Sequence, residues 1–433
     1  MTKSARAERC LQVAIVAAAS IMALSAGCGG AERRGWLERE PDPLLGDASE
    51  ERVPACEGLR CSRDLKKVLH GCDDHVVEEC GVDQGCGAGK CVDACLSAEL
   101  SKGSTGCSFW ALPPDDRRYA AGSCFTAMIA NTWERPVTIT ADLGQEPLDL
   151  SSSIYVAEKN GKETVYTRLD GPLPPGQVAL VFLSQAESAA SSLSFTRCPD
   201  GVVPAFVGDP IAHRTTRTRA FRLKTDAPVS AYSIFPYGGA SSVVPTASLL
   251  LPVTSWGTSY VAVSSWAIKP GMPTLQLIAN EDETEVRMRP TADISDGEGV
   301  VGGARGHVQT WRLSRGEVLQ ITQPEELSGS AIESDKPVGL FGGSECTFIP
   351  STVWACDLTQ QQIPPLANWG AEYALVPYRP RGLANENVPW RLVGAVDGTV
   401  LTSPAPAARP LRSQRARSRR SRRTSSRPSE ARG

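Results

Sequence analysis

Histidine is scarce in this 433-residue sequence, and several familiar catalytic motifs are absent from it. Only four histidines occur, and none lies in an H-E-x-x-H or H-x-H pattern. The G-x-S-x-G elbow and the P-loop are also missing. Glycine-rich stretches at 299–306 and 341–344 have strand-and-turn surroundings, which favours tight turns over phosphate binding. We therefore expect a protein that is not an enzyme and holds no metal or other cofactor.

A long apolar run suited to crossing a membrane is missing as well. The longest candidate, residues 11–26, is short and Ala-rich, follows three basic residues and ends in small residues just before Cys28. This pattern predicts a signal peptide over residues 1–27 with a bacterial lipobox, and lipidation of Cys28. An ordinary signal peptide cleaved near Ala26 is the alternative. Gly29 is compatible with passage to the outer membrane of a Gram-negative bacterium.

A strong excess of positive charge is found only at the end of the chain. Residues 409–433 contain ten Arg and one Glu, and the rest of the chain has 35 basic against 47 acidic residues. An acidic body gives no indication of nucleic-acid binding. We interpret the Arg-rich tail as disordered, and its abrupt change in composition is typical of an out-of-frame reading or a truncation. A native tail that binds an acidic polymer is the alternative.

Cysteine is plentiful and points to an oxidising compartment. Apart from Cys10 and Cys28, the count is even, which in an exported chain indicates disulfides whose pairing the spacing does not give. The predicted disulfide cysteines are Cys56, Cys61, Cys72, Cys80, Cys86, Cys91, Cys95, Cys107, Cys124, Cys198, Cys346 and Cys356.

Seven of these cysteines fall within residues 56–95, where large apolar side chains are few. Such a segment needs cross-links to hold it, so we predict a small disulfide-rich module over residues 55–106. A zinc knuckle is the competing interpretation, but no C-x2-C pair is present. Residues 29–54 before it are charged and aperiodic, which predicts a flexible tether.

The remainder of the chain contains the same set of motifs twice. Asp226-x-Pro228-Val229 matches Asp335-x-Pro337-Val338, and a proline followed by Trp256-Gly257-x-x-Tyr260 matches one followed by Trp369-Gly370-x-x-Tyr373. Leu251-Pro252 aligns with Ile363-Pro364 in this comparison. Because these residues recur, we interpret Pro228, Trp256, Tyr260, Pro337, Trp369 and Tyr373 as residues that define the repeat structurally, although sugar stacking on the tryptophans is an alternative.

Each repeat opens with two alternating apolar runs around a polar turn, a pattern that predicts a β-hairpin. The runs flank Asn131–Arg135 in the first repeat and Asn280–Glu283 in the second, and a third echo surrounds Asp397-Gly398. The acidic turn at Asn280–Glu283 is a weak candidate for calcium, with a solvated loop tip as the simpler interpretation. A G-x-V strand follows each pair of runs.

These patterns predict an all-β fold with two tandem, internally duplicated β-sandwich-like units after the disulfide-rich module. A closed barrel or an intertwined double sheet is the alternative. The predicted boundaries are residues 107–270 for the first unit, 271–387 for the second and 388–408 for the start of a third, with the tail at 409–433.

The two repeats differ in the loop between the D-x-P-V strand and the Trp-Gly element. In the second repeat this loop is bounded by Cys346 and Cys356. Phe348, Ile349, Val353 and Trp354 on it would form an apolar tip, which makes it the candidate binding loop. A loop folded onto its own core is the alternative.

The repeated motifs resemble the N-terminal domain of IgGFc-binding protein and its bacterial lipoprotein relatives. CFTAMIANTWERPVTI, TDAPVSAYSIFPYGG and LLLPVTSWGTSYVAV carry the resemblance in the first repeat, and SDKPVGLFGGSEC and ACDLTQQQIPPLANWGAEY in the second. The cysteine-rich leader resembles that of the bacterial members. This resemblance implies an extracellular binding or adhesive β module without catalytic residues, and it does not transfer an immunoglobulin ligand.

The sequence therefore predicts a lipid-anchored, non-catalytic binding or adhesion protein at the cell surface. Its expected partners are the membrane, through the lipid anchor, and an extracellular protein or glycan, with no nucleic acid. A glycan-active enzyme or carbohydrate-binding protein on a β scaffold is one alternative. A purely structural envelope component is the other.

Overall fold

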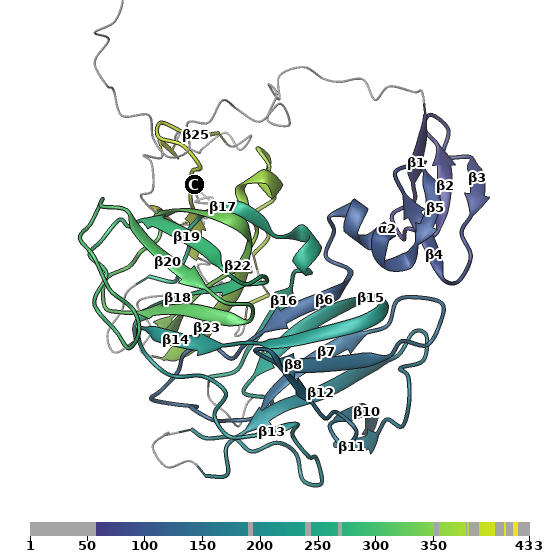
Figure 1. The fold of residues 1–433 in the computed structure, drawn as a ribbon, viewed down its shortest axis with the longest axis horizontal. Helices are drawn as coiled ribbons and strands as arrows, with labels where there is room; N and C mark the ends of the chain where they lie inside the picture. Colours follow the sequence, from purple (N-terminus) through teal and green to yellow (C-terminus); the bar gives the residue numbers. More distant parts are fainter. Residues whose placement is uncertain are drawn as a thin grey trace, which may run out of the picture. The chain divides into compact units, whose positions relative to one another are not determined.

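Antiparallel strands dominate the structure, as the sequence predicts (Figure 1). The computed structural model describes residues 58–188, 194–238, 244–266, 271–349, 355–377, 379–380, 389–402, 411–412 and 419–422. Cys28, the predicted signal peptide and the predicted tether lie outside this part of the chain. Among the described residues, no helix has the length and apolar character needed to cross a membrane.

The cysteine-rich module consists of short strands and one helix. A three-stranded antiparallel sheet and a two-stranded hairpin precede helix α2 (Ala94–Ser101). The Asp93 carboxylate caps this helix by accepting hydrogen bonds from the backbone N–H groups of Cys95 and Leu96, at 2.9 and 3.1 Å. The strands are β1 (Leu59–Cys61), β2 (Lys67–His70), β3 (Val76–Glu79), β4 (Gln84–Gly87) and β5 (Lys90–Asp93).

The first large sheet has ten strands, coloured blue to teal in Figure 1. Its central path runs β11-β10-β12-β7-β15-β8-β9, and β6, β13 and β16 join at its sides. The strands are β6 (Gly106–Ala111), β7 (Phe125–Ala130), β8 (Ile139–Leu143), β9 (Glu146–Leu148), β10 (Ile154–Asn160), β11 (Glu163–Arg168), β12 (Val178–Gln185), β13 (Phe206–Val207), β15 (Phe221–Phe235) and β16 (Thr246–Leu250).

The second large sheet has eight strands, mostly green in Figure 1. Its path runs β14-β21-β18-β22-β19-β20, and β17 and β23 both pair with β22. The strands are β14 (Thr216–Arg219), β17 (Gly257–Val261), β18 (Pro273–Ala279), β19 (Thr284–Arg289), β20 (Gln309–Leu313), β21 (Glu317–Thr322), β22 (Ala331–Phe348) and β23 (Cys356–Ile363).

One long strand organises each sheet, and the D-x-P-V motif lies within it. In β15, the part before the motif pairs with β6 and β8, and the part after it pairs with β7 and β16. In β22, the part before the motif pairs with β17 and β19, and the part after it pairs with β18 and β23. The two repeats therefore have the same strand plan, which confirms the predicted duplication within an all-β fold.

The predicted hairpins are wrong. β7 and β8 do not pair with each other, because both pair antiparallel with β15, at its two ends. β18 and β19 are related to β22 in the same way. Two alternating apolar runs around a polar turn have the same pattern whether they pair with each other or with a third strand. The long strand supplies the partner for both runs, and residues 131–138 connect β7 to β8.

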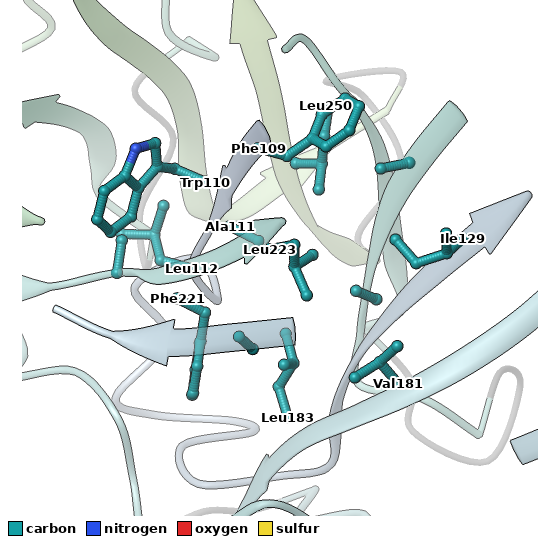
Figure 2. Close-up of a cluster of buried hydrophobic side chains, with 14 of the residues drawn as sticks. Phe109, Trp110, Ala111, Leu112, Ile129, Val181, Leu183, Phe221, Leu223 and Leu250 are labelled. Atoms are coloured by element: carbon teal, nitrogen blue, oxygen red, sulfur yellow. The ribbon is translucent and has the colours of Figure 1, made fainter. Parts of the chain in front are cut away.

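A shared apolar core joins the two sheets. Its main cluster holds first-sheet residues such as Phe109, Phe221 and Leu250, together with Ile278 and Phe341 of the second sheet. Figure 2 shows the first-sheet part, where Phe109 lies beside Leu250. A second cluster lies within the second sheet. Burying large apolar side chains between the sheets favours a fixed packing of one repeat against the other.

Short strand pairs follow the second sheet. β24 (Pro389–Leu392) pairs with β27 (Arg419–Arg422), and β25 (Val400–Leu401) pairs with β26 (Leu411–Arg412). β26 and β27 lie in the tail that the sequence predicts to be disordered, and the disorder of the tail stays a prediction. Their partners come from the predicted start of a third unit.

Candidate functional site

The D-x-P-V motif fixes the point at which each long strand changes partners. Asp226 accepts a hydrogen bond from the backbone N–H of Thr138 at 2.8 Å, and Asp335 accepts the equivalent bond from Glu285 at 2.8 Å. The register of β15 against β6 shifts between Lys224 and Val229, where Pro228 has no N–H to donate to a ladder. The motif thus sets local backbone geometry in both repeats.

The Trp-Gly element forms a corner that docks on the long strand of the next repeat. The Tyr260 hydroxyl accepts a hydrogen bond from the Gly257 N–H at 3.0 Å and donates one to the Val338 carbonyl at 2.5 Å. The Trp256 indole donates to the Leu251 carbonyl at 3.2 Å. Tyr260 is 1% exposed and Trp256 is 8% exposed, so this corner is buried.

Close packing around the corner depends on two glycines. A Cβ added at Gly257 would lie 2.7 Å from Pro365, and one added at Gly339 would lie 2.6 Å from the Trp256 ring. Either distance is shorter than a real Cβ contact, so only glycine fits there without a shift of its neighbours. Gly339 directly follows Val338, which makes D-x-P-V-G the sequence of the strand that accepts a tryptophan corner.

An earlier copy of the same corner, at residues 106–109, is not among the repeat motifs predicted from the sequence. Gly106 on β6 pairs with Val229, as Gly257 pairs with Val338, and Phe109 lies opposite Leu223, as Tyr260 lies opposite Ile332. A Cβ at Gly106 would clash with Pro252, the counterpart of Pro365. The shared signal is Gly-x-x-aromatic, which Thr105 in place of tryptophan made inconspicuous.

The third copy of the corner is formed but not docked. The Tyr373 hydroxyl accepts a hydrogen bond from the Gly370 N–H at 3.0 Å, and the Trp369 indole donates to the Pro364 carbonyl at 3.1 Å. Tyr373 is nevertheless 64% exposed. By these bonds Pro364 corresponds to Leu251, and the 3-10 turns that follow Pro252 and Pro365 make those two prolines equivalent. The predicted alignment of Leu251-Pro252 with Ile363-Pro364 is therefore wrong by one residue.

Sheet pairing therefore divides the chain differently from the sequence repeat. The Trp-Gly strand looks in the sequence like the last element of its unit. By pairing, β17 completes the sheet of the second repeat, and β14, which also precedes residue 270, joins that sheet too. We call residues 106–109, 257–260 and 370–373 the first, second and third corner segments. Each precedes the repeat to which it pairs or would pair.

The predicted binding loop is only partly within the described residues. Val353 and Trp354 lie outside them. Phe348 lies at the end of β22 and is 8% exposed, and Ile349 is partly exposed. Phe348 is thus buried. For this residue, the burial agrees with the alternative prediction of a loop folded onto its own core. The role of the loop in binding stays a prediction.

Ten of the predicted disulfide cysteines are joined in five bonds. The pairs are Cys61–Cys86, Cys80–Cys91, Cys95–Cys107, Cys124–Cys198 and Cys346–Cys356. Cys56 lies outside the described residues, so the predictions for Cys56 and Cys72 stay predictions. The first two bonds hold the cysteine-rich module, and the last closes the base of the predicted binding loop.

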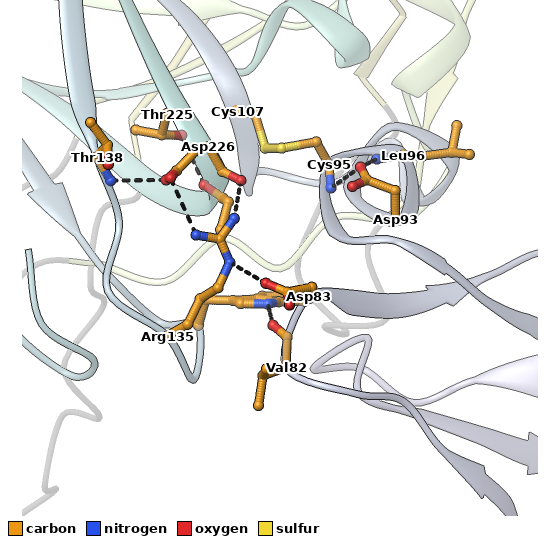
Figure 3. Close-up of a disulfide and its surroundings, with 12 residues drawn as sticks. Val82, Asp83, Asp93, Cys95, Leu96, Cys107, Arg135, Thr138, Thr225 and Asp226 are labelled. Atoms are coloured by element: carbon orange, nitrogen blue, oxygen red, sulfur yellow. Dashed lines mark hydrogen bonds and ion pairs between the residues drawn. A yellow bond between two sulfur atoms is a disulfide. The ribbon is translucent and has the colours of Figure 1, made fainter. Parts of the chain in front are cut away.

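The cysteine-rich module is tied to the first repeat at its D-x-P-V motif (Figure 3). Cys95 on α2 is bonded to Cys107 in the first corner segment. The Arg135 guanidinium pairs with Asp83 of the module at 3.0 Å and with Asp226 at 3.2 Å, and it also donates to the Asp226 carbonyl. These contacts hold the module against the place where β15 changes partners.

Glutamine side chains cross the junction between the two sheets. The Gln276 amide donates to the Pro113 carbonyl at 3.2 Å, and Gln360 donates to the Leu112 carbonyl at 3.3 Å. Gln360 also donates to Gln276 at 2.8 Å, and Gln276 donates to Gln320 at 2.9 Å. Because all three glutamines are buried, unpaired amides there would carry a large desolvation cost.

His213 is held between two carboxylates at this junction. Its Nδ1 lies 2.7 Å from Asp115 and its Nε2 lies 3.1 Å from Asp209. Burial alone would lower the pKa of His213, but the hydrogen bonds to Asp115 and Asp209 outweigh it and raise this pKa to about 10. An imidazolium with both nitrogens engaged is not available as a general base. Asp115 is 98 residues away in sequence, so spacing gave no sign of the pair.

Two further buried acids lie near this histidine. Burial, followed by the nearby Asp115 charge, raises the pKa of Glu345 to about 7. Burial also raises the pKa of Asp116 to about 6, although the backbone N–H groups of Tyr119 and Ala120 donate to its carboxylate. Because Asp115, Asp116 and Glu345 are all buried, they form an internal cluster, and this is not the open pair of carboxylates that a glycosidase needs.

A shallow hollow of about 460 Å³ lies beside this junction. Its charged groups already have partners in the protein: Arg217 pairs with Glu317 at 2.7 Å, Arg219 with Glu146 at 3.2 Å, and Asp209 bonds to His213. In the predicted calcium turn, Asp282 accepts hydrogen bonds from the backbone N–H of Arg315 and from Gln145. Within the described residues, no group of three or more His, Cys, Asp or Glu side chains is arranged to hold a metal ion.

The comparison with protein families gives a match in the second half of the chain. The family model described as IgGFc binding protein matches residues 246–418. This stretch is similar to the IgGFc-binding family. It contains the second sheet from β17 onward, the third corner segment and part of the Arg-rich tail, and it confirms the resemblance seen in the motifs. Neither the curated proteins nor the solved structures gave a match.

The family match over residues 246–418 supports a binding-type extracellular protein. The disulfides agree with this compartment, since such bonds form and persist in oxidising surroundings. Within the described residues, the polar clusters are engaged in internal contacts between repeats. The exposed apolar segment at the third corner is the feature best suited to an interaction.

Proposed function

We propose that this protein is a lipid-anchored, non-catalytic binding or adhesion protein on the surface of a Gram-negative bacterium. The proposal is supported by the succession of a predicted signal peptide over residues 1–27 before Cys28, a disulfide-linked module and a stretch that matches the IgGFc-binding family model. The anchor attaches the chain to the membrane, and the repeats are presented on the outside.

The anchor is tested at Cys28. Labelled palmitate should enter the full chain, and Cys28→Ala should abolish labelling and move the protein from the membrane fraction to the soluble fraction. Cys10→Ala, within the predicted signal peptide, is the matched control and should leave the label in place. Unchanged membrane partitioning of the Cys28→Ala protein would contradict the anchor.

The proposed ligand is an extracellular protein or glycan, and the acidic body makes nucleic acid an unsuitable partner. The family name refers to the Fc part of IgG, so this fragment belongs on the same array as glycans and surface proteins. Binding that falls after substitution in the Cys346–Cys356 loop would support the proposed loop. A protein that binds nothing on a broad array would favour the purely structural alternative, and glycan turnover would favour an enzyme.

A further inference from the structure

Among the described residues there are three corner segments, and two of them pair with a long strand. The first corner pairs with β15 and the second with β22, each with its glycine opposite the valine of a D-x-P-V motif. Phe109 and Tyr260 are buried as a result, at 0% and 1% exposed. A corner therefore has a defined partner in this fold, which is a long strand with a free edge.

The third corner has the internal geometry of the second before any docking. The bonds from Gly370 to Tyr373 and from Trp369 to Pro364 reproduce those of the second corner within 0.1 Å. The 3-10 turn Leu366–Asn368 also matches the turn Val253–Ser255. The corner is thus preorganised, and docking would not require it to be built.

The residues after the third corner expose what the second corner buries. Ala262 is 0% exposed, whereas its counterpart Leu375 is 46% exposed. Val263 is partly buried, whereas its counterpart Val376 is 74% exposed. Within the described part of the chain, residues 370–376 take part in no strand pairing. The sequence after residue 380 contains no D-x-P-V motif. An extended apolar segment with open backbone groups is suited to adding to the edge of a sheet.

We propose that residues 370–376 are a docking strand for a further repeat of this same kind, and that they bind along its D-x-P-V-G strand. The Trp256 ring covers Gly339, so an acceptor for the Trp369 corner needs glycine after the valine. β15 has Ser230 at this position and receives a corner without tryptophan. Glycine after the valine therefore determines which long strands can accept the third corner.

The test inserts an acceptor into the full chain. A second copy of residues 264–363 is placed directly after Val376, the counterpart of Val263, so that the spacing from corner to long strand matches that of the second repeat. Hydrogen exchange of residues 371–376 should slow by at least about 100-fold relative to the natural chain, as expected for an edge that becomes part of a stable sheet. Tyr373→Ala in the extended chain should reverse this slowing.

A matched control addresses specificity. Gly339→Ser made in the inserted copy alone should remove most of the protection at residues 371–376 while leaving the core strands of that copy protected. The proposal is overturned if the inserted repeat is itself protected and residues 371–376 exchange as fast as in the natural chain.

If the inserted repeat fails to fold, the full-length Trp256→Ala, Tyr260→Ala protein decides the matter. Its β22 edge loses the second corner, and the third corner of the same or another copy should occupy that edge. Protection of residues 371–376 that Tyr373→Ala abolishes supports the proposal. A folded protein in which residues 371–376 remain unprotected contradicts it. Neither outcome depends on the lipid anchor.

Discussion

Tyr260 and Tyr373 hold the same position in two copies of one corner, but only 1% of Tyr260 is exposed against 64% of Tyr373. Both hydroxyls accept a hydrogen bond from the glycine three residues earlier, at 3.0 Å. The difference lies in the partner, since Tyr260 also donates to Val338 of a long strand. The corner is therefore a self-contained turn, and a neighbouring sheet turns it into part of a core.

The largest contrast should come from the two corner tryptophans. Trp256→Ala would leave a cavity over Gly339 and should lower the free energy of unfolding by about 3–5 kcal/mol. Trp369→Ala, at a partly exposed position, should cost well under half as much. Chemical denaturation of both proteins checks this. Equal losses would mean that burial on the long strand does not distinguish the two corners.

A change in pH should alter the stability of the second repeat through a buried carboxyl group. Glu345 lies on β22, beyond the part of that strand that seats the second corner, and its pKa in the folded protein is raised to about 7. A carboxyl with a raised pKa stabilises the fold below its unfolded pKa near 4.5, and this contribution is lost as pH rises through 7. The free energy of unfolding should fall by up to about 3 kcal/mol between pH 5 and pH 8 on account of this group.

Asp116 contributes with the same sign between its unfolded pKa near 3.8 and about 6, and His213 does so between its unfolded pKa near 6.5 and about 10. Glu345→Gln should therefore flatten the profile between pH 5 and 8 without making it level. Urea titrations across this range provide the measurement. A Glu345→Gln profile as steep as that of the natural protein would show that the carboxyl is not responsible.

The smallest and most local contrast concerns a single oxygen atom. Tyr260→Phe removes the donor to Val338 and the acceptor for Gly257, and it should cost about 1–2 kcal/mol because both backbone groups lose a partner. Tyr373→Phe should change stability by less than about 0.5 kcal/mol, since its hydroxyl is exposed to water. Thermal unfolding of the two single variants gives the comparison, and a similar loss in both would count against separate roles.

The sequence was sufficient for the fold class and for the order of the repeated elements. Periodic recurrence of Pro228-Val229 and Pro337-Val338 reflects strand geometry that any copy must satisfy, so it can be recognised without coordinates. The pairing partner of each strand could not be predicted from the sequence in the same way. β17 follows the first repeat directly in sequence, and only its ladder with β22 shows that it completes the second.

The polar residues at the junction of the two sheets could not be predicted from the sequence for a related reason. His213 and Asp115 are brought together by the packing of two sheets, and neither lies in a motif. The earlier Asp209, four residues before His213, was the one local sign of a carboxylate partner. The first corner at Gly106–Phe109 was within reach, because Gly-x-x-aromatic recurs at the other two corners.

The placement of each corner ahead of its acceptor gives the chain a direction of assembly. Because β17 precedes β22 in the chain, the corner of a repeat is synthesised before the long strand that accepts it, and its Gly257–Tyr260 bond lies within the corner itself. Repeats are thus completed one after another, from the N-terminal side of the chain onward. Such a tandem array can be lengthened by duplicating a segment that begins just before a Trp-Gly pair and ends just before the next one. The contact between a corner and its long strand is then copied unchanged.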